Sequence, residues 1–198
     1  DRAGLSPDDG PTHHGLFDIA MIRSIPNIVF MQPKDEAEFV HMLRTMNHYQ
    51  NGPTVIRYPR GCGAGTPVPA KAEILPIGKA EVLQAGQDVT LVSLGTMIGI
   101  ARETASLLEA RGYTVTLINA RFIKPLDDEC IRRHAARSRV VCTFEDHSIS
   151  GGFNSAVLES LETGDVKTPV EAIAWPDQFI EHGSESVSYT HLRAHETR

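Results

Sequence analysis

Short apolar runs alternate along this chain with segments in which apolar residues recur every three or four positions. The runs predict buried strands, and the periodic segments predict helices. Alternation of the two is typical of an α/β protein. Strands are predicted at 28–31, 54–57, 80–83, 89–94, 114–118, 140–144 and 170–174, and helices at 15–25, 35–46, 97–111, 127–136 and 152–161.

The segment 61–77 differs from its neighbours, because it is rich in Gly and Pro and has little periodicity. It is interpreted as a linker between two parts of the chain. The β/α steps beyond it predict a compact, mostly parallel sheet of five strands, with the strand before Val89 as an antiparallel edge. The last stretch, 184–198, has no apolar period and is predicted to be disordered or not native to the protein.

Composition and net charge exclude several classes of binding partner. The formal net charge of −6 and the pI near 5.8 argue against nucleic acid and against an anionic membrane surface as partners. No apolar run approaches the length that spans a bilayer. The odd number of cysteines, without a CxxC pair, favours a reducing cytosol and therefore a cytoplasmic location.

The opening loop, residues 1–15, concentrates groups that can do chemistry. Arg2 offers a planar fork that suits phosphate or carboxylate. His13 can move protons near neutral pH, and Asp9 is an acidic neighbour that can orient it. The structural alternative is a solvated turn that leads into a helix.

A second cluster, Arg57-Tyr58-Pro59-Arg60-Gly61, follows a predicted strand, and ligands of α/β sheets gather at such carboxyl ends. The alternative is that Arg57 pairs with a surface acid and Arg60 is solvated. Residue chemistry alone therefore indicates an anionic-substrate site built from Arg2, Asp9, His13 and Arg60, and it does not name a reaction.

Other motifs are weaker. The run 61–66 lacks the Lys and the following helix of a phosphate-binding loop, and is assigned to the linker. Glu145-Asp146-His147 with Gly151-Gly152 is either a site or an interface. The histidines on predicted helices have no partners at metal-ligand spacing, so no metal site is predicted.

Ordered motifs give the chain a resemblance to a known family. DRAG, DGPTHHGLFDIA, IPNIVFMQPKDEAE and GPTVIRYPRG resemble the end of the pyrimidine-binding domain of the 1-deoxy-D-xylulose-5-phosphate synthases, which are transketolase-like enzymes. LPIGKAEVL, DVTLVSLGT, INARFIKPLD, FEDHSISGGFNSAV and PDQFIEHG resemble their C-terminal domain. The resemblance places these domains at 1–60 and 78–183. Because the earlier strands of the first domain are missing, the strands 28–31 and 54–57 are expected to expose unpaired edges.

This resemblance implies a transferase that condenses pyruvate with D-glyceraldehyde 3-phosphate, giving 1-deoxy-D-xylulose 5-phosphate and CO2 for isoprenoid, thiamine and pyridoxal synthesis. It implies a homodimer that uses thiamine diphosphate and Mg²⁺. Arg2 and Arg60 match positions that hold the acceptor phosphate, and His13 and Asp9 match catalytic positions.

The family's Gly-Asp-Gly and Glu-Gln-His motifs do not occur in this sequence. The cofactor and metal are therefore expected to bind the missing N-terminal and central regions, and the chain is expected to be an inactive C-terminal fragment. Two alternatives stay open. One is a subunit of a split transketolase-like or 2-oxoacid dehydrogenase-like enzyme, and the other is a non-catalytic α/β assembly module.

Overall fold

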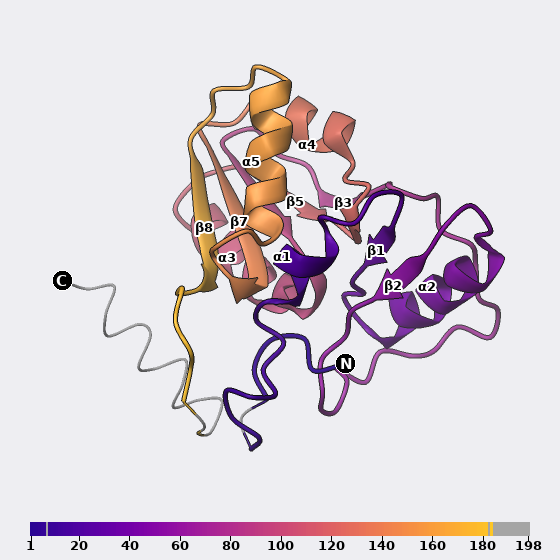
Figure 1. Ribbon diagram of the computed structural model, residues 1–198. Coiled ribbons are helices and arrows are strands. Elements are labelled where there is room, and N and C mark those ends of the chain that lie inside the picture. The colour runs from indigo at the N-terminus through magenta and orange to yellow at the C-terminus, as the bar shows by residue number, and fades with distance from the viewer. Residues whose placement is uncertain (7, 182, 184–198) are drawn as a thin grey trace.

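The computed structural model describes residues 1–6, 8–181 and 183, and shows two sheets surrounded by helices (Figure 1). The predicted tail 184–198 lies outside the described residues. The helices are α1 (Asp18–Ile22), α2 (Glu36–His48), the 3-10 turn η1 (Gly95–Met97), α3 (Ile98–Glu109), α4 (Asp128–Ala135) and α5 (Phe153–Thr163). The strands are β1 (Val29–Met31), β2 (Thr54–Ile56), β3 (Glu81–Gln84), β4 (Val89–Ser93), β5 (Val115–Asn119), β6 (Phe122–Lys124), β7 (Val140–Ser148) and β8 (Val170–Trp175).

The larger sheet has five strands in the order β3-β5-β4-β7-β8. All neighbouring strands are parallel except β3, which runs antiparallel to β5 at the edge. This confirms the predicted α/β class, the mostly parallel sheet and its antiparallel edge. The central strand β4 is buried along its whole length, as expected where helices cover both faces.

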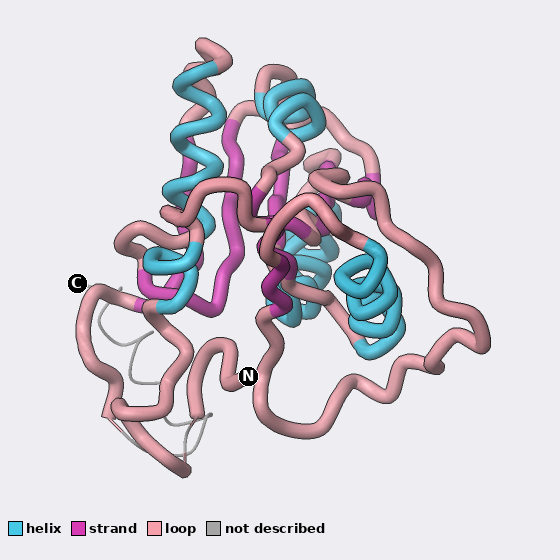
Figure 2. The backbone as a smooth tube through the Cα atoms, turned by 45° about the vertical axis from the view of Figure 1, so that its right-hand side comes forward, coloured by secondary structure: helices cyan, strands magenta, loops and turns pink. Residues whose placement is uncertain are grey.

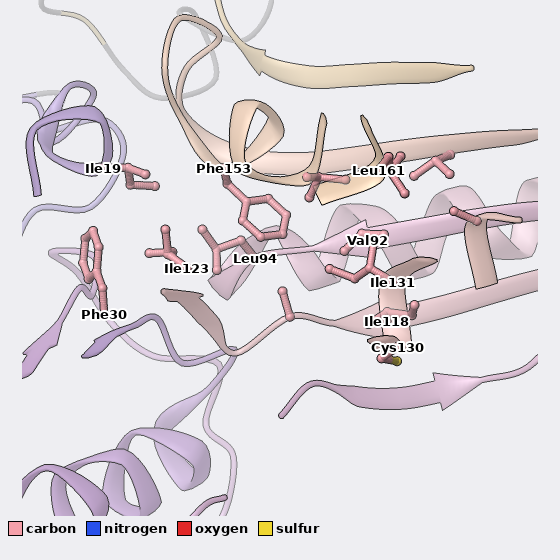
Figure 3. Close-up of a cluster of buried hydrophobic side chains, with 14 residues drawn as sticks. Ile19, Phe30, Val92, Leu94, Ile118, Ile123, Cys130, Ile131, Phe153 and Leu161 are labelled. Carbon is pink, nitrogen blue, oxygen red and sulfur yellow. The ribbon is translucent and has the colours of Figure 1, made fainter. Parts of the chain in front are cut away.

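Helices on opposite faces of this sheet enclose two apolar clusters. Helix α3 packs on one face through Ile98, Ala101 and Ala105. Helices α4 and α5 pack on the other, where Ile131 and Phe153 meet the strands. Figure 3 shows that this second cluster also contains Ile19, Phe30 and Ile123. The core therefore continues from the large sheet into the first part of the chain.

The smaller sheet corrects one expectation. Its order is β2-β1-β6, and β6 comes from the part of the chain beyond residue 78. Strand β1 pairs in parallel with β2 and antiparallel with β6, so the expectation that 28–31 exposes an unpaired edge was wrong. Strand β6 was not predicted, because a three-residue strand carries too little periodicity and its partner lies far away in the sequence.

The helix predicted at 15–25 is much shorter, only Asp18–Ile22. The residues before it bond to other segments: Gly15 exchanges backbone hydrogen bonds with Gly4, and the Leu16 carbonyl accepts from the Ser148 amide. Strand β7 is longer than predicted and runs on through the polar residues to Ser148, opposite Trp175 of β8. Backbone pairing to distant segments overrides the local pattern in both cases.

The segment predicted as a linker is part of the long loop between β2 and β3 (pink in Figure 2). It is attached to α2, because the Leu75 amide donates to Thr45 Oγ1 at 2.8 Å. The Leu75 side chain is buried with Met42 and Phe122. The domain limits at 60, 77 and 183 stay predictions. Within the ranges that the structure describes, no helix is long and apolar enough to cross a membrane.

Candidate functional site

Backbone contacts hold the opening loop against the carboxyl end of β2. The Ala3 amide donates to the Tyr58 carbonyl at 3.0 Å. The other end of the loop folds back on its start, where the amides of Gly4 and Gly15 donate to each other's carbonyls at 3.1 and 2.9 Å. A Cβ on Gly15 would lie 2.1 Å from the Arg2 carbonyl oxygen, so this close return requires glycine.

Three of the four predicted site residues meet at one carboxylate. Asp9 accepts a hydrogen bond from Ser6 Oγ at 2.8 Å and another from Arg60 Nη1. Arg2 Nε lies 3.8 Å from the same Asp9 oxygen. The Ser6 hydroxyl and the two guanidinium groups hold the pKa of Asp9 below its usual value, against a smaller opposing effect of desolvation.

The fourth residue, His13, is exposed on the same loop. Its Nδ1 lies 2.9 Å from Thr12 Oγ1, and its amide donates to the Gly10 carbonyl. In the described part of the chain, no hydrogen bond or ion pair joins its ring to Asp9 or the arginines. The adjacent His14 has a different environment: its Nδ1 accepts from the Ser6 amide at 2.8 Å, and its Nε2 donates to the Ile180 carbonyl at 3.0 Å. His14 therefore anchors the loop, while His13 is accessible.

A cavity of about 340 Å³ lies at the same end of the small sheet. Its lining includes residues that follow β1, such as Pro33 and Lys34, and residues that flank Arg60 in the chain, such as Pro59 and Gly61. Carboxyl ends of parallel strands are where α/β proteins bind ligands, and β1 and β2 are parallel. The cavity therefore borders the chain on both sides of Arg60, but its lining does not include Arg2, Asp9, His13 or Arg60.

Arg57 does not belong to the exposed cluster. It is buried and donates from Nε to Asp18 at 2.9 and 3.0 Å. Its Nη1 donates to Gln32 Oε1 at 2.8 Å and to Asp146, and its Nη2 donates to the Gly15 carbonyl. It therefore pairs with acids, as the structural alternative held, but inside the protein rather than at its surface.

The Glu145-Asp146-His147 motif joins secondary-structure elements. Glu145 accepts the Phe153 and Asn154 amides at 2.6 and 2.8 Å, at the start of α5. Burial raises the pKa of Glu145 to about 7. His147 donates from Nδ1 to the Ser148 carbonyl at 2.7 Å and accepts the Ala20 amide at Nε2, while burial lowers its pKa. Both side chains are buried inside this chain, and their bonds join β7 to α5 and to α1.

The sequence pattern did not indicate that Glu38 is another buried carboxylate. Glu38 of α2 accepts from Asn119 Nδ2 at 2.9 Å and from Arg121 Nε at 2.7 Å, and so ties α2 to the end of β5 and the segment that follows it. A helical projection would have shown it, because Glu38 lies on the same face as the buried Met42 and Thr45. A charge on the buried face of a helix indicates a buried partner.

The described residues contain no group of three or more His, Cys, Asp or Glu side chains that could hold a metal ion. In the glycine-rich run 61–66, the Gly65 amide donates to Glu36 Oε1 at 2.7 Å, so a carboxylate of the protein itself occupies this backbone donor. The described residues therefore do not fit a thiamine diphosphate–Mg²⁺ site.

The fold agrees with comparisons against known proteins. Residues 78–196 match the model of the transketolase C-terminal domain, and residues 1–64 match that of the transketolase pyrimidine binding domain. The chain belongs to the transketolase C-terminal domain family.

Individual relatives are more specific. The chain is 51% identical over 187 residues to a 1-deoxy-D-xylulose-5-phosphate synthase of Heliobacterium modesticaldum, covering 94% of this chain and 29% of that protein. It is 49% identical to the synthase of Synechococcus elongatus, covering 97% of this chain and 30% of that protein. The predicted family resemblance is thus confirmed, although the chain spans under a third of the length of these relatives.

Solved structures share the fold. A split-gene transketolase, described as an inactive beta4 tetramer, superposes with a TM-score of 0.77 at 30% identity, covering 93% of this chain and 57% of that one. The transketolase of Campylobacter jejuni has a TM-score of 0.65 at 19% identity, covering 93% of this chain and 27% of that one. The second similarity concerns the fold alone.

Proposed function

We propose that this chain is part of a 1-deoxy-D-xylulose-5-phosphate synthase, a thiamine-diphosphate-dependent transferase that condenses pyruvate with D-glyceraldehyde 3-phosphate and releases CO2. The observation that carries the proposal is the meeting of Arg2, Asp9 and Arg60 at one carboxylate, beside the exposed His13. Arg60 and Asp9 are 51 positions apart in the chain, so folding brings them together. The identity of about half with named synthases supports the substrate class.

Arg2 and Arg60 are assigned to the acceptor phosphate. Their guanidinium groups face one carboxylate oxygen of Asp9, and a phosphate dianion would present the same kind of acceptor with more charge. Asp9 holds the two guanidinium groups near each other before the substrate binds. Such pre-organisation lowers the entropic cost of binding.

His13 is assigned to proton transfer. An accessible imidazole has two ring nitrogens that can donate or accept a proton, and the Thr12 hydroxyl lies 2.9 Å from Nδ1 and restrains the ring. With Thr12 as the donor to Nδ1, the Nε2 atom carries the proton and faces away from this contact. Asp9, on the same loop, is the acidic neighbour, and we assign both residues to catalysis.

Thiamine diphosphate and Mg²⁺ are assigned to other parts of the intact enzyme, since the described residues do not fit them. We further propose that the intact enzyme is a cytoplasmic homodimer. Residues 1–60 would be the end of its pyrimidine-binding domain, and residues 78–183 its C-terminal domain.

The test is product formation by an intact synthase in which this chain follows the cofactor-binding regions. With pyruvate, D-glyceraldehyde 3-phosphate, thiamine diphosphate and Mg²⁺, we expect 1-deoxy-D-xylulose 5-phosphate and CO2 in equal amounts, measured by mass spectrometry. The chain by itself should give neither. Transfer of a two-carbon unit from a ketose phosphate, with no turnover of pyruvate, would show a transketolase instead.

A second candidate is a subunit of a split enzyme. The observation in its favour is the TM-score of 0.77 with a split-gene transketolase whose tetramer is inactive. The two candidates differ in what restores activity. A separately expressed cofactor-binding subunit that co-purifies with this chain and gives turnover would favour the split enzyme.

A further inference from the structure

Arg57 has an unusual number of polar partners for a buried residue. Only 3% of its surface is exposed. Its guanidinium donates to Asp18 of α1, to Gln32 after β1 and to Asp146 of β7, and so contacts three elements that are distant in the sequence. Gln32 Nε2 also donates to both oxygens of Asp146, at 3.2 and 3.1 Å, which closes the network.

The candidate loop is fixed at both ends to this short stretch of chain. At its start, the Ala3 amide bonds to the carbonyl of Tyr58, which directly follows Arg57. At its end, the Gly15 carbonyl accepts from Arg57 Nη2. Arg60 leaves the same strand end. The placement of Arg57 therefore sets the position of the loop and of Arg60 together.

A planar fork is what this position needs. Arg57 donates in three directions at once, to two carboxylates and to a backbone carbonyl. A lysine ammonium is a compact point charge and cannot span these acceptors. An Arg57→Lys change would keep the charge in the network while releasing part of its geometry.

We propose that Arg57 is a positioning residue for recognition of the acceptor phosphate: it sets the spacing between Arg2 and Arg60 without touching the substrate. This inference rests on the proposed function, because the phosphate is the ligand that the two arginines would share. It assigns to Arg57 a role in selectivity for a phosphorylated acceptor, beyond its role in stability.

The experiment compares two acceptors in the intact synthase. D-Glyceraldehyde 3-phosphate carries the phosphate, and D-glyceraldehyde lacks it. Arg57→Lys should raise KM for the phosphorylated acceptor roughly tenfold, since a small misplacement of binding groups is costly. KM for pyruvate should stay within about twofold, and kcat/KM for D-glyceraldehyde should change little.

Arg23→Lys is the matched control. Arg23 also ties α1 to a distant element, through two bonds to Glu159 at 2.9 and 2.6 Å, and among the described residues its side chain donates only to Glu159 and to the Gly151 carbonyl. This variant should leave the preference between the two acceptors unchanged. If Arg57→Lys lowers kcat/KM equally for both acceptors, Arg57 has a structural role only, and the proposal is overturned.

A double mutant tests whether Arg57 acts through Arg60. In an Arg60→Ala background, Arg57→Lys should add little to the rise in KM, because the group that it positions is gone. Independent, additive losses would contradict the proposal.

If Arg57→Lys fails to fold, Asp18→Asn replaces it, since this change weakens one side of the network and leaves Arg57 bonded to Gln32 and Asp146. A smaller loss with the same selectivity is expected, and an unselective loss would overturn the proposal.

Failure of the proposed function would be visible separately. If the wild-type protein makes no product, calorimetric titration with D-glyceraldehyde 3-phosphate still decides the role of Arg57. Binding that weakens roughly tenfold in Arg57→Lys and is unchanged in Arg23→Lys would support it. Equal affinity of wild type and Arg57→Lys, or no binding by the wild type, would refute it.

Discussion

Two arginines at the same strand end have opposite environments. The Arg57 side chain is 2% exposed and bonds to Asp146 and Asp18. The Arg60 side chain is 50% exposed and bonds to Asp9. The residue types are the same, but the Arg57 guanidinium is shielded from water whereas the Arg60 guanidinium is half exposed. The buried network can therefore fix a geometry, whereas the exposed cluster can exchange its carboxylate for a ligand.

The energetic reason lies in desolvation. A buried ion has lost its hydration, so removing one partner leaves an unpaired charge that water cannot reach. An exposed ion pair gains little over two hydrated ions, and little is lost when it opens. The comparison predicts large effects on stability at Arg57 and its surroundings, and effects on binding or turnover in the exposed cluster.

The largest effect is expected from Arg57→Ala. It leaves Asp146 and Asp18 without their buried cation and removes the bond to the Gly15 carbonyl. The free energy of unfolding should fall by about 3–5 kcal/mol. Urea unfolding followed by circular dichroism measures this change. A loss of unfolding free energy as small as that expected for Arg60→Ala would contradict the contrast between the buried and the exposed arginine.

Glu145 is a buried carboxyl, and its contribution to the free energy of unfolding should depend on pH. Its pKa in the folded protein is about 7, against 4.5 as its ordinary value, because burial disfavours the carboxylate. The folded state therefore binds the proton more tightly, and the free energy of unfolding should fall by about 3 kcal/mol as pH rises from 4.5 to 7.

Glu145→Gln should remove this contribution. The lowered pKa of His147 contributes the opposite slope, with stability lost as pH falls below its ordinary value of 6.5 through its folded pKa. Since His147 is present in both proteins, the difference between their unfolding free energies isolates Glu145. Identical pH profiles from urea titrations would contradict the raised pKa.

His13→Ala is expected to act on turnover. Loss of a group that transfers protons should lower kcat of the intact synthase about a hundredfold. Because His13 is exposed, the urea midpoint should hardly change. His48→Ala, at an exposed position on α2, serves as the control. Full turnover without His13 would remove this residue from the mechanism.

The smallest effect is expected from Arg60→Ala. One of two phosphate contacts is lost, so KM for D-glyceraldehyde 3-phosphate should rise roughly tenfold while kcat falls less. The urea midpoint should stay close to that of the wild type, since the pair with Asp9 is exposed. An unchanged KM would count against the phosphate role, and a large loss of stability would show that the two arginines are alike.

Local patterns were enough for much of the fold. Helix α2 was predicted from the carboxylates of its first turn and its apolar face, and Asp35 does cap it by accepting the Glu38 amide. The strands of the large sheet were predicted from short apolar runs. Such signals lie within a few residues of one another, so a sequence displays them directly.

The wrong predictions concern segments that pair with distant parts of the chain. Strand β6 and the true length of α1 depend on bonds to β1, Gly4 and Ser148. Backbone amides and carbonyls are the same in almost every residue, so no sequence pattern predicts such pairing. Predicted strand 28–31 was therefore assigned an open edge that the fold in fact covers.

The candidate site shows the same division. The sequence alone determined which groups are available: an arginine, an aspartate and a histidine on a glycine-bounded loop, and a second arginine after a strand. Only the tertiary structure decided that Arg57 is buried and Arg60 exposed, and that Asp9 lies between Arg2 and Arg60. The physical reason is that residue chemistry is local, whereas access to water, which determines what a charge can do, depends on which distant segments pack around it.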